Sequence, residues 1–173
     1  MRPWSNTRLQ PAGLVQGVMN MVKPSLWAAV VLMVGATAAW ADAGHEYINA
    51  PRPALNAALP FSDAVRAGDT LYVSGTLGVD PKTGKAVEGT EAEAHAMLDA
   101  FKATVERAGY TMDDVVTLQV YCTDLALYDT FNGVYRGYFG QHFPARAFIG
   151  VKDLVRGAHF EVQGIAVRTA PAH

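Results

Sequence analysis

Cysteine and charge are scarce in this chain of 173 residues, and each scarcity excludes a class of protein. A single cysteine, Cys122, excludes a disulfide framework and a cysteine-rich zinc site, and we expect it to be a small buried hydrophobe. Only 17% of the residues are charged and 50% are hydrophobic, which excludes a disordered chain and a coiled coil. The length suits one domain of about 100–150 residues with its own core.

Charge, tryptophan and histidine are unevenly distributed along the chain. Residues 1–41 contain three basic residues, no acidic residue and all three tryptophans. The remainder contains 11 basic and 16 acidic residues, a net charge of −5, together with all five histidines. This division predicts two parts with different roles.

The first part has the features of a targeting sequence. Residues 26–40 (LWAAVVLMVGATAAW) are uncharged, follow a basic region and precede alanine-rich cleavage sites, whereas a membrane span needs about 20 apolar residues. We therefore expect residues 1–41 to be a cleaved signal peptide, and the mature protein to be periplasmic or secreted without a membrane contact. An uncleaved anchor and a buried core helix are the alternatives. Met19 or Met21 would give a more usual start, with residues 1–18 untranslated.

Residues 42–173 are expected to form one α+β domain. Their hydrophobic patterns and turn signals predict five strands, at 61–67, 70–76, 115–123, 146–151 and 159–167, and two helices, at 90–108 and 128–139. The order β-β-α-β-α-β-β predicts a sheet with both helices on one face.

Local signals refine the two helices. Thr90 and Glu93 have the spacing of a capping box, and Gly109 is expected to end the first helix. Gly133 and Gly137 interrupt the second helix and are expected to allow close contact between helix and sheet.

The two faces of the last expected strand differ in polarity. Its small and apolar face, suited to the helices, is formed by Phe160, Val162, Gly164 and Ala166. The other face is half-polar and is formed by His159, Glu161, Gln163 and Ile165. A partner subunit is expected to cover this second face, and an ordinary solvated face is the alternative.

Several well-known site motifs are missing. No G-x-S-x-G elbow surrounds Ser74, no P-loop is present, and the histidines lack metal-binding spacings. The net charge of −5 disfavours a nucleic-acid surface. Arg146, at the start of a strand, and Glu161, within a strand, remain as candidates, although each also fits an ordinary surface charge.

Seven segments in the second part carry a resemblance to a known family. They are AVRAGDTLYVSG (64–75), DPKTG (80–84), AGYTMDDVV (108–116), TDL (123–125), FNGVYRGYF (131–139), FPAR (143–146) and FEVQGIAV (160–167). In this order they resemble the Rid (YjgF, reactive intermediate deaminase) family over residues 48–169. The resemblance implies a chorismate-mutase-like α+β fold and a homotrimer with three clefts between subunits. It also implies cofactor-free, metal-free hydrolysis of enamine and imine acids, such as 2-aminoacrylate and 2-iminopropanoate, to 2-keto acids and ammonia.

The same resemblance assigns roles to individual residues. Arg146 matches the arginine that binds the substrate carboxylate, a task suited to a guanidinium fork. Glu161 matches the acidic residue, which can orient a water molecule and take its proton. Ser74 and Gly75 match the strand end that borders the cleft, and Asn132 matches a helix residue near the subunit boundary.

Three positions depart from the family pattern. Phe61 stands where the deaminase branch usually has tyrosine, Phe148 where it often has cysteine, and Gln163 where glutamate is frequent. Phe61 and Phe148 are candidate substrate contacts. Because neither carries the family's usual side chain, they favour an alternative function, a trimeric module that binds small carboxylates without turnover. A third possible function is hydrolysis of another kind of bond, including the endoribonuclease activity attached to some relatives. The acidic composition disfavours RNA as the substrate.

Overall fold

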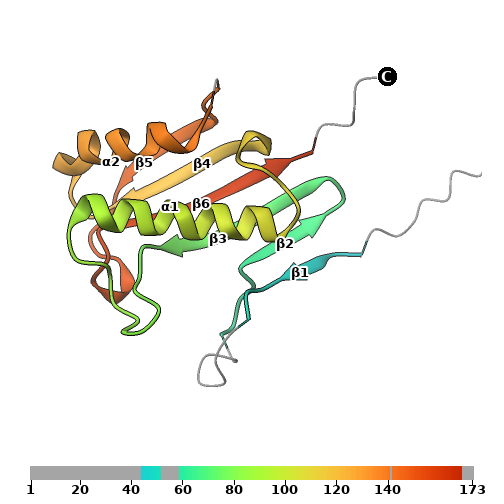
Figure 1. Cartoon of the computed structure of the whole chain (residues 1–173), viewed down its shortest axis with the longest axis horizontal. Helices are drawn as coiled ribbons and strands as arrows, with labels where there is room; N and C mark the ends of the chain where they lie inside the picture. The colour runs from blue at the N-terminus through green and yellow to red at the C-terminus, as the bar shows by residue number, and fades with distance from the viewer. Residues whose placement is uncertain (1–43, 52–58, 141, 169–173) are drawn as a thin grey trace, which may run out of the picture. The chain divides into compact units, whose positions relative to one another are not determined.

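The computed structural model describes residues 44–51, 59–140 and 142–168 (Figure 1). The expected signal peptide lies outside the described residues. Within those three ranges, no helix is long and apolar enough to cross a membrane.

The described residues form one mixed sheet with two α-helices on the same face (Figure 1). The strands are β1 (Glu46–Ile48), β2 (Ala64–Ala67), β3 (Thr70–Leu77), β4 (Val115–Cys122), β5 (Ala145–Gly150) and β6 (Phe160–Val167). The helices are α1 (Thr90–Arg107) and α2 (Tyr128–Tyr135), with short 3-10 turns η3 (Met112–Asp114), η4 (Leu125–Leu127), η5 (Arg136–Tyr138) and η6 (Val155–Gly157). The strand order is β1-β2-β3-β6-β4-β5, and only β4 and β5 run parallel. The expected α+β architecture is confirmed.

The start of the sheet differs from the expectation. β1 has only three residues, too few for an alternating pattern to reveal it. The first expected strand begins only at Ala64, because the residues before it are held by side chains. The Ser74 hydroxyl donates to the Ser62 carbonyl oxygen at 2.7 Å, and the Asp63 amide donates to the Asn49 side chain at 3.1 Å.

Helix α1 covers β3 and β6 and packs against α2. Its buried apolar stripe is Ala94, Met97, Leu98, Phe101 and Val105. At the crossing with β6, a Cβ on Gly164 would lie 2.9 Å from the Phe101 ring and 2.8 Å from the Thr117 carbonyl oxygen. Only glycine allows this approach, and the expected helix-facing side of β6 is thereby confirmed. Gly109, with φ of +77°, follows the helix end as expected.

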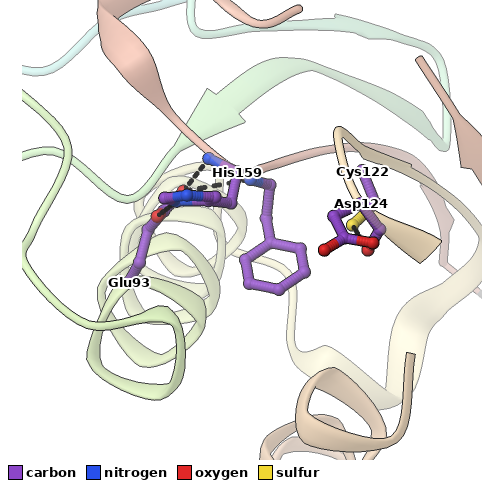
Figure 2. A network of polar contacts seen from close by, with 5 residues as sticks. Glu93, Cys122, Asp124 and His159 are labelled. Carbon is purple, nitrogen blue, oxygen red and sulfur yellow. Dashed lines mark hydrogen bonds and ion pairs between the residues drawn. The ribbon is translucent and has the colours of Figure 1, made fainter. Parts of the chain in front are cut away.

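The expected capping box at the start of α1 is wrong. The residue before the helix is Gly89, and no side chain caps the helix. The Glu93 side chain is fully buried and points instead toward β6 (Figure 2). Its carboxylate accepts hydrogen bonds from the backbone amides of His159 at 2.6 Å and Phe160 at 3.0 Å, and lies 2.7 Å from His159 Nδ1. Glu93 therefore joins α1 to the beginning of the last strand.

We expect Glu93→Gln to lower the free energy of unfolding by about 1–3 kcal/mol. The amides of His159 and Phe160, which donate to one carboxylate oxygen, lose a charged acceptor, and the other oxygen, next to His159 Nδ1, becomes an NH2 group. Glu91→Gln, two residues away on the exposed surface of the same helix turn, is the matched control. Urea unfolding at one protein concentration measures both variants. Equal midpoints for Glu93→Gln and Glu91→Gln would show that the buried carboxylate does not support the fold.

The second helix is shorter than expected and its glycines are not contact points. α2 ends at Tyr135 and continues as the 3-10 turn η5. A Cβ on Gly133 or Gly137 would meet no atom within 4 Å, so the expected close contact with the sheet is wrong at both positions. Both glycines lie on the exposed side of the segment.

Cys122 is fully buried, as expected for a small hydrophobe. Its thiol donates a hydrogen bond to the Asp124 carbonyl oxygen at 3.0 Å, next to the end of β4 (Figure 2). Burial raises the pKa of the Cys122 thiol. The thiol is therefore held in its protonated, unreactive form.

Candidate active site

Arg146 lies on β5 and faces the side of the sheet that carries the helices. Its register partner on the parallel strand β4 is Leu118, which is fully buried in the core. Paired residues of neighbouring strands share a face, so the guanidinium lies on the α2 side. Four ring centroids lie 4.5–5.8 Å from its Cζ atom, and we call this set the aromatic cluster: Tyr128, Phe131, Tyr135 and Phe148.

The sequence of α2 explains the aromatic cluster. Tyr128, Phe131 and Tyr135 recur at intervals of three and four residues, which places them on one helix face. Phe148 follows Arg146 by two residues on β5 and therefore shares its face. Cation–π attraction holds the guanidinium above these rings. Arg146 makes no hydrogen bond or ion pair with any residue the structure describes, so its donors remain available to a ligand.

Tyr135 contributes an unused polar group to this region. Its side chain is buried, and its hydroxyl has no hydrogen-bond partner among the described residues. Burial raises the pKa of Tyr135 to about 12, while the positive charge of Arg146 acts weakly in the opposite direction. The hydroxyl therefore stays protonated and can donate a hydrogen bond.

A pocket of about 330 Å³ opens beside Arg146. Its walls are formed by Tyr128, Asn132, Tyr135, Arg136, Phe143, Pro144 and Arg146. The predicted site residues Asn132 and Arg146 are thus brought together. Phe148 is not part of the pocket wall; its ring packs edge-on against Tyr128, with centroids 5.1 Å apart, beneath the guanidinium. Phe148, predicted as a substrate contact, therefore packs next to the Arg146 guanidinium and does not line the pocket.

A second group of predicted residues gathers around Glu161 on β6. The ladder between β3 and β6 is irregular between Val73 and Thr76, so Ser74 and Gly75 form a bulge opposite β6. A Cβ on Gly75 would overlap the Glu161 carboxylate, so glycine is required for the carboxylate to lie against this strand. Burial raises the pKa of Glu161 above the ordinary value of 4.5. A partly buried carboxylate with a raised pKa is suited to act as a general base.

Phe61 lies next to this second group. The ring is 52% exposed and lines a shallow groove together with Ser62 and Ser74. The structure therefore brings Phe61 next to Ser74, which lies within β3 and not at a strand end as predicted, and the family resemblance implies a tyrosine hydroxyl at this position. The groove at this position presents a hydrocarbon ring in place of that donor.

The face of the sheet without helices is half-polar, as predicted for Glu161, Gln163 and Ile165 of β6. The prediction for His159 is wrong, because this residue precedes β6 and its ring lies against Glu93 of α1. Glu161, Gln163 and Ile165 are half-buried, and Gln163 donates hydrogen bonds to the Tyr121 hydroxyl at 2.9 Å and to Gln119 on β4. A groove of about 320 Å³ runs along this face between β3 and β4, lined by Tyr72 among others.

Arg146 and Glu161 do not meet within one protomer. Glu161 pairs with Tyr121 across the β4–β6 ladder, whereas Arg146 pairs with Leu118 across the β4–β5 ladder. Tyr121 and Leu118 are three residues apart on β4 and point to opposite faces. The candidate site residues therefore form two half-sites: Arg146 with Asn132 under α2, and Glu161 with Ser74 and Gly75 on the open face.

The contributions of Tyr128, Tyr135 and Arg136 were not predicted from the sequence. Their spacing of seven and eight residues along α2 is a detectable signal, because such residues share one helix face. Among the described residues, no group of three His, Cys, Asp and Glu side chains could hold a metal ion.

Comparison with known proteins places the chain in a family. Residues 51–168 match the family model described as endoribonuclease L-PSP. The chain is 38% identical over 112 residues to the 2-iminobutanoate/2-iminopropanoate deaminase of Salmonella typhimurium, covering 63% of this chain and 88% of that protein. It is 40% identical over 111 residues to a RutC family protein of Saccharolobus solfataricus, covering 64% and 88%.

Solved structures agree with this match. The crystal structure of the Escherichia coli YjgF gene product aligns with a TM-score of 0.64 at 34% identity, covering 72% of this chain and 99% of that one. RidA from the Antarctic bacterium Psychrobacter aligns with a TM-score of 0.61 at 34% identity, covering 70% and 94%. The chain therefore belongs to the endoribonuclease L-PSP family, also known as the YjgF/Rid family.

Proposed function

We propose that this protein hydrolyses small enamine and imine acids to 2-keto acids and ammonia, without a cofactor. The observation that carries the proposal is the Arg146 guanidinium, held by rings at the wall of a pocket with its hydrogen-bond donors unused by the described residues. The relatives named 2-iminobutanoate/2-iminopropanoate deaminase support the same reaction class.

Arg146 binds the substrate carboxylate in this proposal. A guanidinium offers two parallel N–H donors that match the two oxygens of a carboxylate. The aromatic cluster surrounds the guanidinium and limits its movement, which favours binding of the carboxylate in one orientation. The C=N bond of the substrate, which is next to the carboxylate, is then held at a defined position for attack.

Glu161 acts as the general base. Its carboxylate takes a proton from a water molecule as the oxygen of that water bonds to the imine carbon, and the C=N bond becomes a C–N single bond. The protonated Glu161 then gives a proton to the amine nitrogen. The C–N bond breaks and ammonia leaves, while the proton of the carbinol hydroxyl passes to the ionised Glu161 carboxylate and the carbon–oxygen bond becomes the carbonyl of the 2-keto acid. Burial raises the pKa of Glu161, which makes its carboxylate a stronger proton acceptor than an ordinary glutamate.

In this proposal, a second subunit completes the active site. Because Arg146 and Glu161 lie on opposite faces of the sheet, one protomer supplies the carboxylate clamp and its neighbour supplies the base. Three equivalent contacts of this kind close into a ring. The half-polar open face, with Gln119, Tyr121 and Gln163, supplies a surface for this assembly.

We expect the protein to be a homotrimer in solution, with a mass three times that of the protomer. Multi-angle light scattering at micromolar concentration measures this directly. A monomer at that concentration would remove the shared site and contradict the proposed arrangement of the two half-sites.

One alternative has a specific structural basis, namely a trimeric module that binds small carboxylates without turnover. Phe61 presents a ring without a hydroxyl beside Ser74, and Phe148 fills the space under Arg146. The deciding experiment is release of ammonia from freshly generated 2-iminopropanoate, measured with and without the protein. Acceleration above the spontaneous rate supports the hydrolase. Binding of 2-keto acids with no acceleration supports the module.

A further inference from the structure

Arg136 lies on the same side of α2 as the pocket beside Arg146. It follows Asn132 by four residues and Tyr128 by eight, and all three line that pocket. Residues at these intervals form one stripe along a helix. Arg136 therefore stands at the C-terminal end of the stripe, one turn beyond Asn132.

The charge of this pocket is unusual for this chain. Residues 42–173 carry a net charge of −5, yet the pocket is lined by two guanidinium groups, Arg136 and Arg146, and by no carboxylate. Neither arginine makes a hydrogen bond or an ion pair with a residue that the structure describes. Two like charges that face one small volume repel each other, and an anionic ligand with two charges relieves this repulsion.

We propose that the pocket binds dicarboxylic 2-imino and 2-keto acids, with Arg136 as the residue that determines this specificity. Arg146 binds the carboxylate next to the reacting carbon, and Arg136 binds the carboxylate at the far end. The rings of Tyr128 and Phe143 flank the carbon chain, and the unpaired Tyr135 hydroxyl adds a donor. This inference rests on the proposed function, because it assumes that Arg146 binds the first carboxylate.

The test compares two stable keto acids of equal chain length. 2-Oxoglutarate and 2-oxopentanoate each have five carbons and differ in the second carboxylate. Isothermal titration calorimetry of the full assembly at low salt is expected to show about fivefold tighter binding of 2-oxoglutarate. A larger ratio is not expected, because Arg136 is exposed and water screens its charge.

Substitutions then assign the preference to Arg136. In Arg136→Gln the ratio of the two affinities is expected to fall to about one, and in Arg136→Glu it is expected to invert in favour of 2-oxopentanoate. Arg107→Gln, the same substitution on the exposed surface of α1, is the control and is expected to keep the parent ratio.

Three outcomes overturn the inference. Equal affinities in the parent protein would overturn it while leaving the proposed function intact. A parent preference that survives in both Arg136 variants would overturn the assignment to this residue. If neither keto acid binds the parent protein, the role of Arg146 in the proposed function fails as well.

Discussion

Replacing Arg146 by lysine is expected to lower the rate of imine hydrolysis by about 100-fold or more, while the domain keeps its fold. Lysine keeps the positive charge but cannot offer two parallel donors to a carboxylate. An ammonium on a flexible stem also changes the cation–π contact in which the guanidinium Cζ atom lies 4.5 Å from the Tyr135 ring centroid. The substrate then binds in several orientations, and few of them present the C=N bond to the attacking water.

The control for this prediction is Arg168→Lys. Arg168 also stacks on a tyrosine, with its Cζ atom 4.4 Å from the centroid of Tyr110, and its side chain donates to the Gly109 carbonyl oxygen. This variant loses the same kind of stacking away from the pocket. Ammonia release and circular dichroism are measured for both variants. Hydrolysis by Arg146→Lys at the rate of Arg168→Lys would exclude Arg146 from the site.

Replacing Glu161 by glutamine is expected to lower the rate by about 10²–10⁴-fold with little loss of keto-acid binding. The amide has almost the same size and can still form hydrogen bonds beside Gly75, but it cannot take a proton from water. Keto-acid affinity and hydrolysis rate, measured on the same preparation, separate the two effects. Glu106→Gln, at an exposed pair with Lys102 on α1, is the control for the loss of one negative charge.

The raised pKa of Glu161 gives this second prediction a pH dependence. The base must be ionised, so the rate of the parent protein is expected to fall as the pH drops through the raised pKa, above the ordinary value of 4.5. The effect on stability has the opposite sign. A carboxyl whose pKa is raised by folding contributes most to stability below its unfolded pKa, and this contribution is lost as the pH rises through the folded pKa.

It follows that Glu161→Gln is expected to melt at a higher temperature than the parent at pH 7. This difference is expected to disappear in acid, where Glu161 is protonated in both states. Such a gain in stability with a loss of rate is typical of a residue retained for activity. If Glu161→Gln hydrolyses imines at the parent rate, the base lies elsewhere.

Much of the fold was predictable because its signals are local. The apolar stripe of α1 repeats over 18 residues and ends before Gly109, and the alternation of β6 separates its two faces. The capping box failed because Thr90 and Glu93 have a local spacing whose meaning depends on a distant partner. Glu93 binds the backbone at His159, 66 residues away, and no pattern near α1 indicates this.

The candidate site was predictable only in part, for a similar reason. Each residue type suits its chemistry, but the face on which Arg146 lies depends on its pairing with β4, which is a contact between distant segments. The edge strand β5 has only partial burial, so its own sequence does not reveal which side faces the helices. The division into two half-sites therefore needed the sheet register, and the clustering of rings around Arg146 needed the position of α2.

The position of β6 has a consequence for how the protein is made. β6 is the last strand among the described residues, yet it lies at the centre of the sheet between β3 and β4 (Figure 1). Until this strand has left the ribosome, β3 and β4 both present unpaired backbone groups, which are templates for aggregation. The sheet can close only after synthesis has passed residue 160, and the buried carboxylate of Glu93 finds its donors at the same moment. The domain can therefore complete its sheet only once β6 is available, and a chain that stops before β6 lacks the strand that joins its two halves.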